Sequence, residues 1–134
     1  MRVLIVFILF IVLVAALFGL RRALRRRRIL SRPFPTAWRR ILKINFPIYN
    51  RLPDRFKAEL ESCIQVFIAE KNFEGCGGLE ITDEIAVTIA AQACLLLLNR
   101  KLSYYPKLSS ILVYPSAFRR HVQDGVEFSK PEPV

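Results

Sequence analysis

Residues 3–20 of the chain read VLIVFILFIVLVAALFGL. These 18 consecutive residues include no charged or polar side chain, and 15 of them are Val, Leu, Ile or Phe. An α-helix rises about 1.5 Å per residue, so the stretch would be roughly 27 Å long, close to the hydrocarbon thickness of a bilayer. A helix in a soluble core does not need apolar residues on every face. The stretch therefore predicts a transmembrane helix, and we expect residues 1–30 to form a membrane anchor.

A cleaved signal peptide is the alternative interpretation, because Arg2 supplies a short positively charged N-terminal region. Two features favour an anchor that is not cleaved. The apolar stretch is longer than the roughly 7–15 residues typical of a signal peptide. In addition, six of the eight residues over 21–28 are Arg, where the small residues of a cleavage site would lie.

The positive charge of the chain is concentrated beside this stretch. The 134 residues include 21 Lys and Arg against 11 Asp and Glu, but residues 1–32 hold eight of the Arg and no acidic residue. Seven of those Arg follow the stretch, so the positive-inside rule places the rest of the chain in the cytoplasm. We expect the Arg cluster to form a cytoplasmic flank that contacts anionic lipid. A role in nucleic-acid binding is the alternative, but we predict no nucleic-acid partner, because residues 33–134 are only slightly basic.

The rest of the chain is predicted to be mainly α-helical with a short β element. Pro33 and Pro35 predict a linker over residues 31–36, and Thr36 is the expected N-cap of a short helix that Pro47 ends. From Asp54 to Lys71, apolar residues recur with helical spacing. The apolar side of this predicted helix comprises Phe56, Leu60, Cys63, Ile64, Phe67 and Ile68. The opposite side, which we interpret as solvated, comprises Arg55, Lys57, Glu59, Glu61, Gln65, Glu70 and Lys71.

A third helix is predicted from Thr82, as N-cap, to about Leu98. Because it is apolar on nearly every side, we expect it to be central to the core. Before it, residues 75–78 predict a turn and residues 79–81 a short extended piece. After it, residues 111–114 predict a strand that Pro115 ends. We expect Tyr104, Tyr105 and Tyr114 to line the core or the wall of a cleft.

The three Cys residues do not form a recognisable metal or redox motif, because their number is odd and no two have the Cys-x-x-Cys spacing. Cys63 and Cys94 lie on apolar helical stretches, so we predict that they are small core residues. Cys76 lies in the Gly-rich segment over residues 74–78, where its thiol could be exposed and functional. We favour the alternative, that this thiol is inert. Glu59 and Glu61 are two residues apart on a helix and point to different sides, so they do not predict an acid–base pair.

Six segments, in this order, carry a resemblance to a known family: 32–38 (RPFPTAW), 49–53 (YNRLP), 67–75 (FIAEKNFEG), 78–84 (GLEITDE), 89–99 (IAAQACLLLLN) and 111–118 (ILVYPSAF). The chain resembles the N-terminal half of the MtfA-like zinc-dependent peptidases, a family of bacterial metallopeptidases. The resemblance implies that residues 37–120 are the helical N-terminal part of a zincin-like α+β peptidase. It also implies zinc as the cofactor of the full-length protein, a peptide substrate, control by a regulatory protein, and location in the bacterial inner membrane.

The zinc motif of that family, His-Glu-x-x-His, does not occur in this chain. The motif needs two His one helical turn apart, and the sequence contains a single His, His121. We interpret His121 as a solvated residue of the polar tail over 121–134, and we expect the chain to be truncated there. The sequence thus assigns no catalytic, cofactor-binding or metal-binding residue.

Two classes of function remain open. The first is the N-terminal portion of a membrane-anchored zinc-dependent peptidase whose catalytic half is missing. The second is a complete, non-catalytic membrane protein whose helical body binds a cytoplasmic partner protein. The predicted helix over 85–98 favours the first class, because a helix that is apolar on all sides needs neighbours on all sides.

Overall fold

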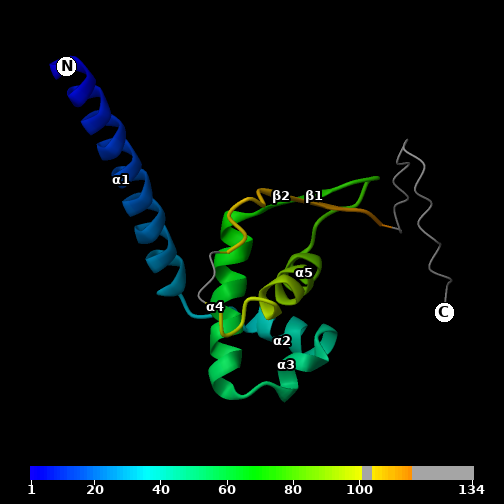
Figure 1. The fold of residues 1–134 in the computed structure, drawn as a ribbon. Coiled ribbons are helices and arrows are strands. Elements are labelled where there is room, and N and C mark those ends of the chain that lie inside the picture. Colours follow the sequence, from blue (N-terminus) through cyan, green and yellow to red (C-terminus); the bar gives the residue numbers. More distant parts are fainter. Residues whose placement is uncertain (101–103, 116–134) are drawn as a thin grey trace, which may run out of the picture.

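The computed structural model describes residues 1–100 and 104–115 (Figure 1). The elements occur in the order α1 (Arg2–Leu30), α2 (Thr36–Asn45), α3 (Pro47–Arg51), α4 (Asp54–Glu70), β1 (Asn72–Gly75), α5 (Asp83–Leu95) and β2 (Ser110–Val113). The described part of the chain is therefore mainly helical with a two-stranded sheet, which confirms the predicted fold class. The predicted tail over 121–134, including His121, lies outside the described residues.

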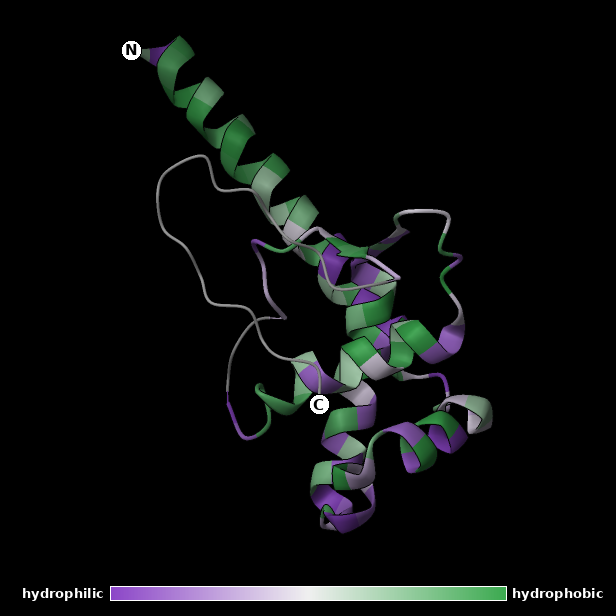
Figure 2. Cartoon of the chain, turned by 90° about the vertical axis from the view of Figure 1, so that its right-hand side faces the viewer, coloured by the Kyte–Doolittle hydropathy of each residue, from purple (hydrophilic) through white to green (hydrophobic). Residues whose placement is uncertain are grey.

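The helix α1 continues without a break from the apolar stretch through the Arg cluster. It extends away from the other helices, and its apolar residues fill most of its length (Figures 1 and 2). None of its residues is buried against the described chain. By length and composition it is long and apolar enough to cross a membrane.

The core lies where α5 packs against α4 and α2. On α5, Val87, Ala90 and Ala91 are fully buried, so the predicted central position of this helix is confirmed. The two Ala side chains are small, which lets the backbone of α5 approach its neighbours closely. On α4, the fully buried residues include Leu60 and Ile64.

The two ends of α5 differ in how well they were predicted. At the N-terminus, the Thr82 hydroxyl accepts a hydrogen bond from the backbone N–H of Ile85, which confirms the predicted cap. At the C-terminus, the helix ends at Leu95, three residues before the predicted end. The chain tightens there into turns with i→i−3 hydrogen bonds, and Asn99 has a φ of 59°, a left-handed conformation that stops a helix. One consequence is that Leu96 is 67% exposed.

At the short helices, one prediction was wrong and one helix was missed. Thr36 is the first residue of α2, whereas Pro35 occupies the N-cap position and no side chain caps the helix. Pro47 comes after the end of α2 but also begins α3, a helix that was not predicted from the sequence. Proline is well suited to the first position of a helix because its φ is already helical and its missing N–H would be unpaired there.

The sheet consists of β1 and β2, which run parallel with Asn72 opposite Ser110 and Gly75 opposite Val113. The predicted strand over 111–114 is confirmed with a shift of one residue. Its partner was not predicted, and the piece over 79–81, expected to be extended, is not a strand. The predicted turn is present, with positive φ at Gly77 and Gly78.

Candidate functional site

The junction between α1 and α4 holds two of the four ion pairs of the described residues, and they share one carboxylate. Arg26 binds Glu70 through two atoms, with an Nε–Oε1 distance of 2.5 Å and an Nη2–Oε2 distance of 2.9 Å. Arg22 adds a third contact to Glu70, at 3.3 Å. Arg25 donates to the backbone carbonyl of Ala69. The basic end of α1 is thus fastened to the C-terminal turn of α4.

Glu70 is well suited to hold this junction. Its side chain is only 10% exposed, so burial alone would favour the neutral acid. The hydrogen bonds from Arg26 outweigh burial and, together with Arg22, lower the pKa of Glu70 below its ordinary value. The guanidinium of Arg26 also lies 4.7 Å from the ring centre of Tyr104, a cation–π contact. Tyr104 therefore lines the junction, in line with the expected wall position.

Lys71 comes directly after Glu70 and is a buried charge at 7% exposure. Its ammonium donates to the carbonyl oxygens of Tyr105 and Leu108, at 2.7 and 2.6 Å. Burial lowers the pKa of Lys71, and the positive charges of Arg22 and Arg26 act in the same direction. The lysine thereby fixes the segment that precedes β2 against the end of α4.

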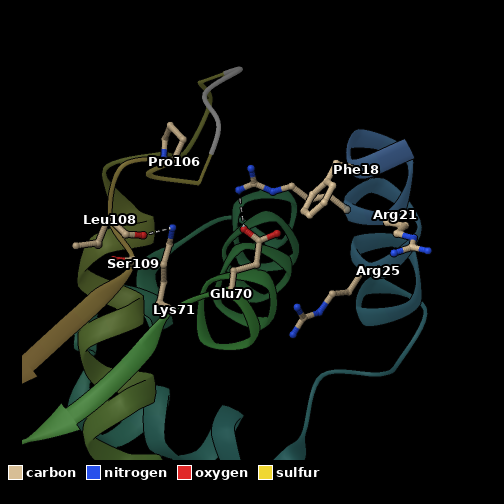
Figure 3. A pocket seen from close by; sticks show the side chains of 9 residues that line it. Phe18, Arg21, Arg25, Glu70, Lys71, Pro106, Leu108 and Ser109 are labelled. Atoms are coloured by element: carbon tan, nitrogen blue, oxygen red, sulfur yellow. Dashed lines mark hydrogen bonds and ion pairs between the residues drawn. The ribbon is translucent and has the colours of Figure 1, made fainter. Parts of the chain in front are cut away.

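A cavity of about 510 Å³ lies between these parts (Figure 3). One wall is a face of α1, on which Phe18, Arg21, Arg22 and Arg25 recur at the i, i+3, i+4, i+7 spacing of one side of a helix. The other walls are the end of α4 and the segment before β2: Glu70, Lys71, Pro106, Leu108 and Ser109. Four of the lining residues are basic and one is acidic, so the cavity favours anions.

A second charge cluster lies inside the body, between α2, α3 and α4. Arg39 binds Glu61 through two nitrogen atoms, each at 2.9 Å, and the hydroxyl of Tyr49 donates to the same carboxylate. Burial would raise the pKa of Glu61, but the bonds from Arg39 and Tyr49 together lower it. Tyr49 is 3% exposed, so this cluster supports packing and offers no open site.

The prediction that one side of α4 is solvated was therefore wrong for Glu61, Glu70 and Lys71. Each is covered by a partner from another element. Glu59 accepts from the backbone N–H of Asn99, whereas Glu61 binds Arg39, so these two carboxylates point to different sides, as predicted.

The resemblance implies zinc, but the part of the chain that the structure describes contains no set of zinc ligands. Within residues 1–100 and 104–115 no three His, Cys, Asp or Glu side chains are grouped so that they could hold a metal ion. Cys63 and Cys94 are buried in the core, as predicted, and their contact together with burial raises the pKa of the Cys94 thiol. Cys76 is half-buried beside β2.

The other two tyrosines have different surroundings. Tyr105 lies against Phe67 and donates to the carbonyl of Ala93, so it is partly buried and packs against the core. Tyr114 is 40% exposed, so of the two expected positions, core or cleft wall, the core is excluded for it.

The cavity was not predicted from the sequence, although one signal for it was present. The four α1 residues that line it lie on one face of the helix, but a run of six Arg within eight residues hides that spacing. The α4 residues that bind Arg22 and Arg25 lie 44 or more positions later in the sequence, and no local pattern indicates them.

Comparison with known proteins places this sequence in a family. The family model described as glucose-regulated metallo-peptidase M90 matches residues 20–132. An uncharacterized protein of Synechocystis sp. is 42% identical to the chain over 95 residues, which are 71% of this chain and 34% of that protein. The chain therefore spans about a third of the length of this curated relative. No solved structure matches the chain.

Proposed function

Because the chain belongs to the glucose-regulated metallo-peptidase M90 family, we propose that it is the N-terminal portion of a membrane-anchored, zinc-dependent peptidase. The observation that carries the proposal is the match over residues 20–132 combined with the much greater length of the relative. In the full-length protein, the zinc ligands and the catalytic base would come from residues beyond those of this chain. Peptide-bond hydrolysis is the reaction that this family membership supports, with a peptide as substrate and a regulatory protein as a further partner.

The proposed anchor is α1. The family match begins at residue 20, the last residue of the apolar stretch, so nearly all of the stretch lies outside the match. Seven Arg between residues 21 and 32 favour a cytoplasmic location for the body at the inner membrane. The contacts of Arg22, Arg25 and Arg26 with α4 would hold the body against the membrane surface.

One observation favours the alternative, a non-catalytic tethered module that binds a cytoplasmic partner protein. Val87, Ala90, Ala91 and Cys94 of α5 are fully buried by elements of this chain alone. A closed core is what a self-sufficient small domain needs. Against it, Leu96 remains exposed and the two-stranded sheet is too small to be stable without support.

The two candidates predict different gene sequences downstream of the codon for Val134. We expect the reading frame to continue into a His-Glu-x-x-His segment, and the protein expressed from the longer frame to bind zinc and cleave peptides. The chain of 134 residues, purified in detergent, is expected to hold no stoichiometric zinc and to cleave no peptide. A stop codon directly after Val134, with no such motif downstream, would favour the tethered module.

The membrane orientation is tested separately. A reporter that is active only in the cytoplasm, fused to the C-terminus, should be active. Neutral replacements of Arg21, Arg22 and Arg25–Arg28 should weaken this orientation and leave insertion intact, because the apolar stretch drives insertion. Activity of a periplasm-only reporter on the unaltered chain would contradict the proposed orientation.

A further inference from the structure

We propose that the cavity between α1 and α4 is a binding site for the phosphate headgroup of an anionic phospholipid. It would hold one lipid at a fixed place, beyond the diffuse attraction of an Arg-rich segment to a charged membrane surface. The inference rests on the proposed membrane anchoring of α1 and is independent of the peptidase assignment.

The charges in the cavity carry the first part of the argument. Arg21, Arg25 and Lys71 line it, together with Arg22. The one acidic lining residue, Glu70, is already bound through both oxygens by Arg26, which lies outside the cavity lining. None of the described bonds to this carboxylate comes from Arg21 or Arg25, so their charges can attract a further anion. Arginine guanidinium groups suit phosphate because they offer several N–H donors in one plane.

The position of the cavity along α1 carries the second part. Phe18 belongs to the apolar stretch, and Arg21 is the first charge after it. In a helix that spans a bilayer, this transition lies at the boundary between hydrocarbon and headgroups. The cavity would thus lie at the depth of the lipid phosphates, on the cytoplasmic side in the proposed orientation.

The mixed lining carries the third part. Phe18, Pro106 and Leu108 give the cavity an apolar portion beside the charges. A lipid supplies both matching chemistries in one molecule, a charged phosphate and an apolar glycerol–acyl region. Free phosphate would satisfy the guanidinium groups but would leave the apolar walls without a partner. The volume of about 510 Å³ is sufficient for a headgroup and the start of its acyl chains.

The test compares two double variants of the full chain that remove the same charge. Arg21→Gln with Arg25→Gln removes two cavity residues. Arg27→Gln with Arg28→Gln removes two exposed residues of the same helix that do not line the cavity. Neither pair includes Arg22 or Arg26, so the bonds to Glu70 are retained. Each protein, purified in neutral detergent, is titrated with phosphatidylglycerol, with phosphatidylcholine and with inorganic phosphate. Native mass spectrometry counts the bound molecules.

We expect one phosphatidylglycerol to bind the unaltered chain saturably, in preference to phosphatidylcholine. The cavity pair should lose about tenfold or more in affinity, because it removes two guanidinium groups that would donate charge-assisted hydrogen bonds to the phosphate, and the control pair should change less than about twofold. Equal losses in both pairs would show diffuse attraction and overturn the proposal. Binding of inorganic phosphate as tight as that of the lipid would overturn the lipid assignment.

A second measurement on the same proteins separates a failure of the membrane anchoring from a failure of the lipid site. Membranes from expressing cells are washed with carbonate at high pH, which releases proteins that do not span the bilayer. Release of the unaltered chain would overturn the proposed anchoring and, with it, this inference. Retention without preference for phosphatidylglycerol would overturn the lipid site alone and leave the anchoring intact.

Discussion

Arg26 and Glu70 lie 44 positions apart in the sequence and form a two-point ion pair at 2.5 and 2.9 Å that joins the long N-terminal helix to the body. The pair is partly buried, with side-chain exposures of 24% for Arg26 and 10% for Glu70. Two parallel N–H···O bonds define a direction as well as a distance. The pair therefore sets how α1 enters the body, which the short linker before α2 could not do alone.

Replacing Glu70 should loosen this connection. Glu70→Gln removes the charge that Arg26 and Arg22 share, and leaves the two guanidinium groups to repel each other. Trypsin should then cut the chain after Arg28 about fivefold faster, for a loss of ~1 kcal/mol in a partly exposed pair. Gel analysis of timed digests in detergent measures the rate. Glu80→Gln is the control, because Glu80 is an exposed carboxylate and the change is chemically the same. Equal rates in both variants would contradict the role assigned to Glu70.

The chain should lose stability in acid because of Glu61 and Glu70. Both have pKa values below the ordinary 4.5, so their ionised forms stabilise the folded state. That contribution is complete above pH 4.5 and is lost as the pH falls through the lower folded-state pKa values. Thermal unfolding followed by circular dichroism between about pH 3 and 7 tests this. The double variant Glu61→Gln with Glu70→Gln should start less stable and show a flatter acid slope. Parallel curves for both proteins would refute the assignment.

Two threonines that look alike in the sequence should respond differently to alanine. Thr82→Ala removes the hydroxyl that accepts from Ile85 and should cost about 0.5–1 kcal/mol of stability. Thr36→Ala should cost less than about 0.5 kcal/mol, because Thr36 is the first residue of α2 and not its N-cap, and no side chain caps that helix. Chemical denaturation of the full chain in detergent compares the two. A larger loss at Thr36 would mean that it caps α2 after all.

Neighbouring positions on α5 should separate the core from the surface. Ala91 is fully buried, so Ala91→Leu should destabilise the fold by about 1–3 kcal/mol through overpacking. Gln92 is exposed on the same helix, and Gln92→Leu should change stability by less than about 0.5 kcal/mol. Thermal unfolding of both variants gives the comparison. Similar losses at the two positions would indicate that α5 is not the central helix.

Several elements are determined by short stretches of sequence alone. The apolar run of α1 needs no tertiary partner to be recognised, because 18 residues without a polar side chain suit only a lipid environment or a core on every side. The apolar side of α4 and the cap at Thr82 depend on neighbours three or four residues away. The burial of Cys63 follows from its position on the apolar side of α4, and that of Cys94 from its position on the apolar helix α5.

Other features depended on contacts between distant parts of the chain. Glu61, Glu70 and Lys71 look like solvated residues in the helical pattern, yet each meets a partner 12 to 48 positions away, and only folding brings those partners together. The strand β1 has the same origin, since Asn72–Gly75 lacks β-branched residues and becomes a strand by pairing with Ser110–Val113. The basic cavity combines α1 with α4 and the segment before β2. Periodicity reports which side of a helix is apolar, whereas the neutralisation of a charge depends on where the opposite charge lies in space.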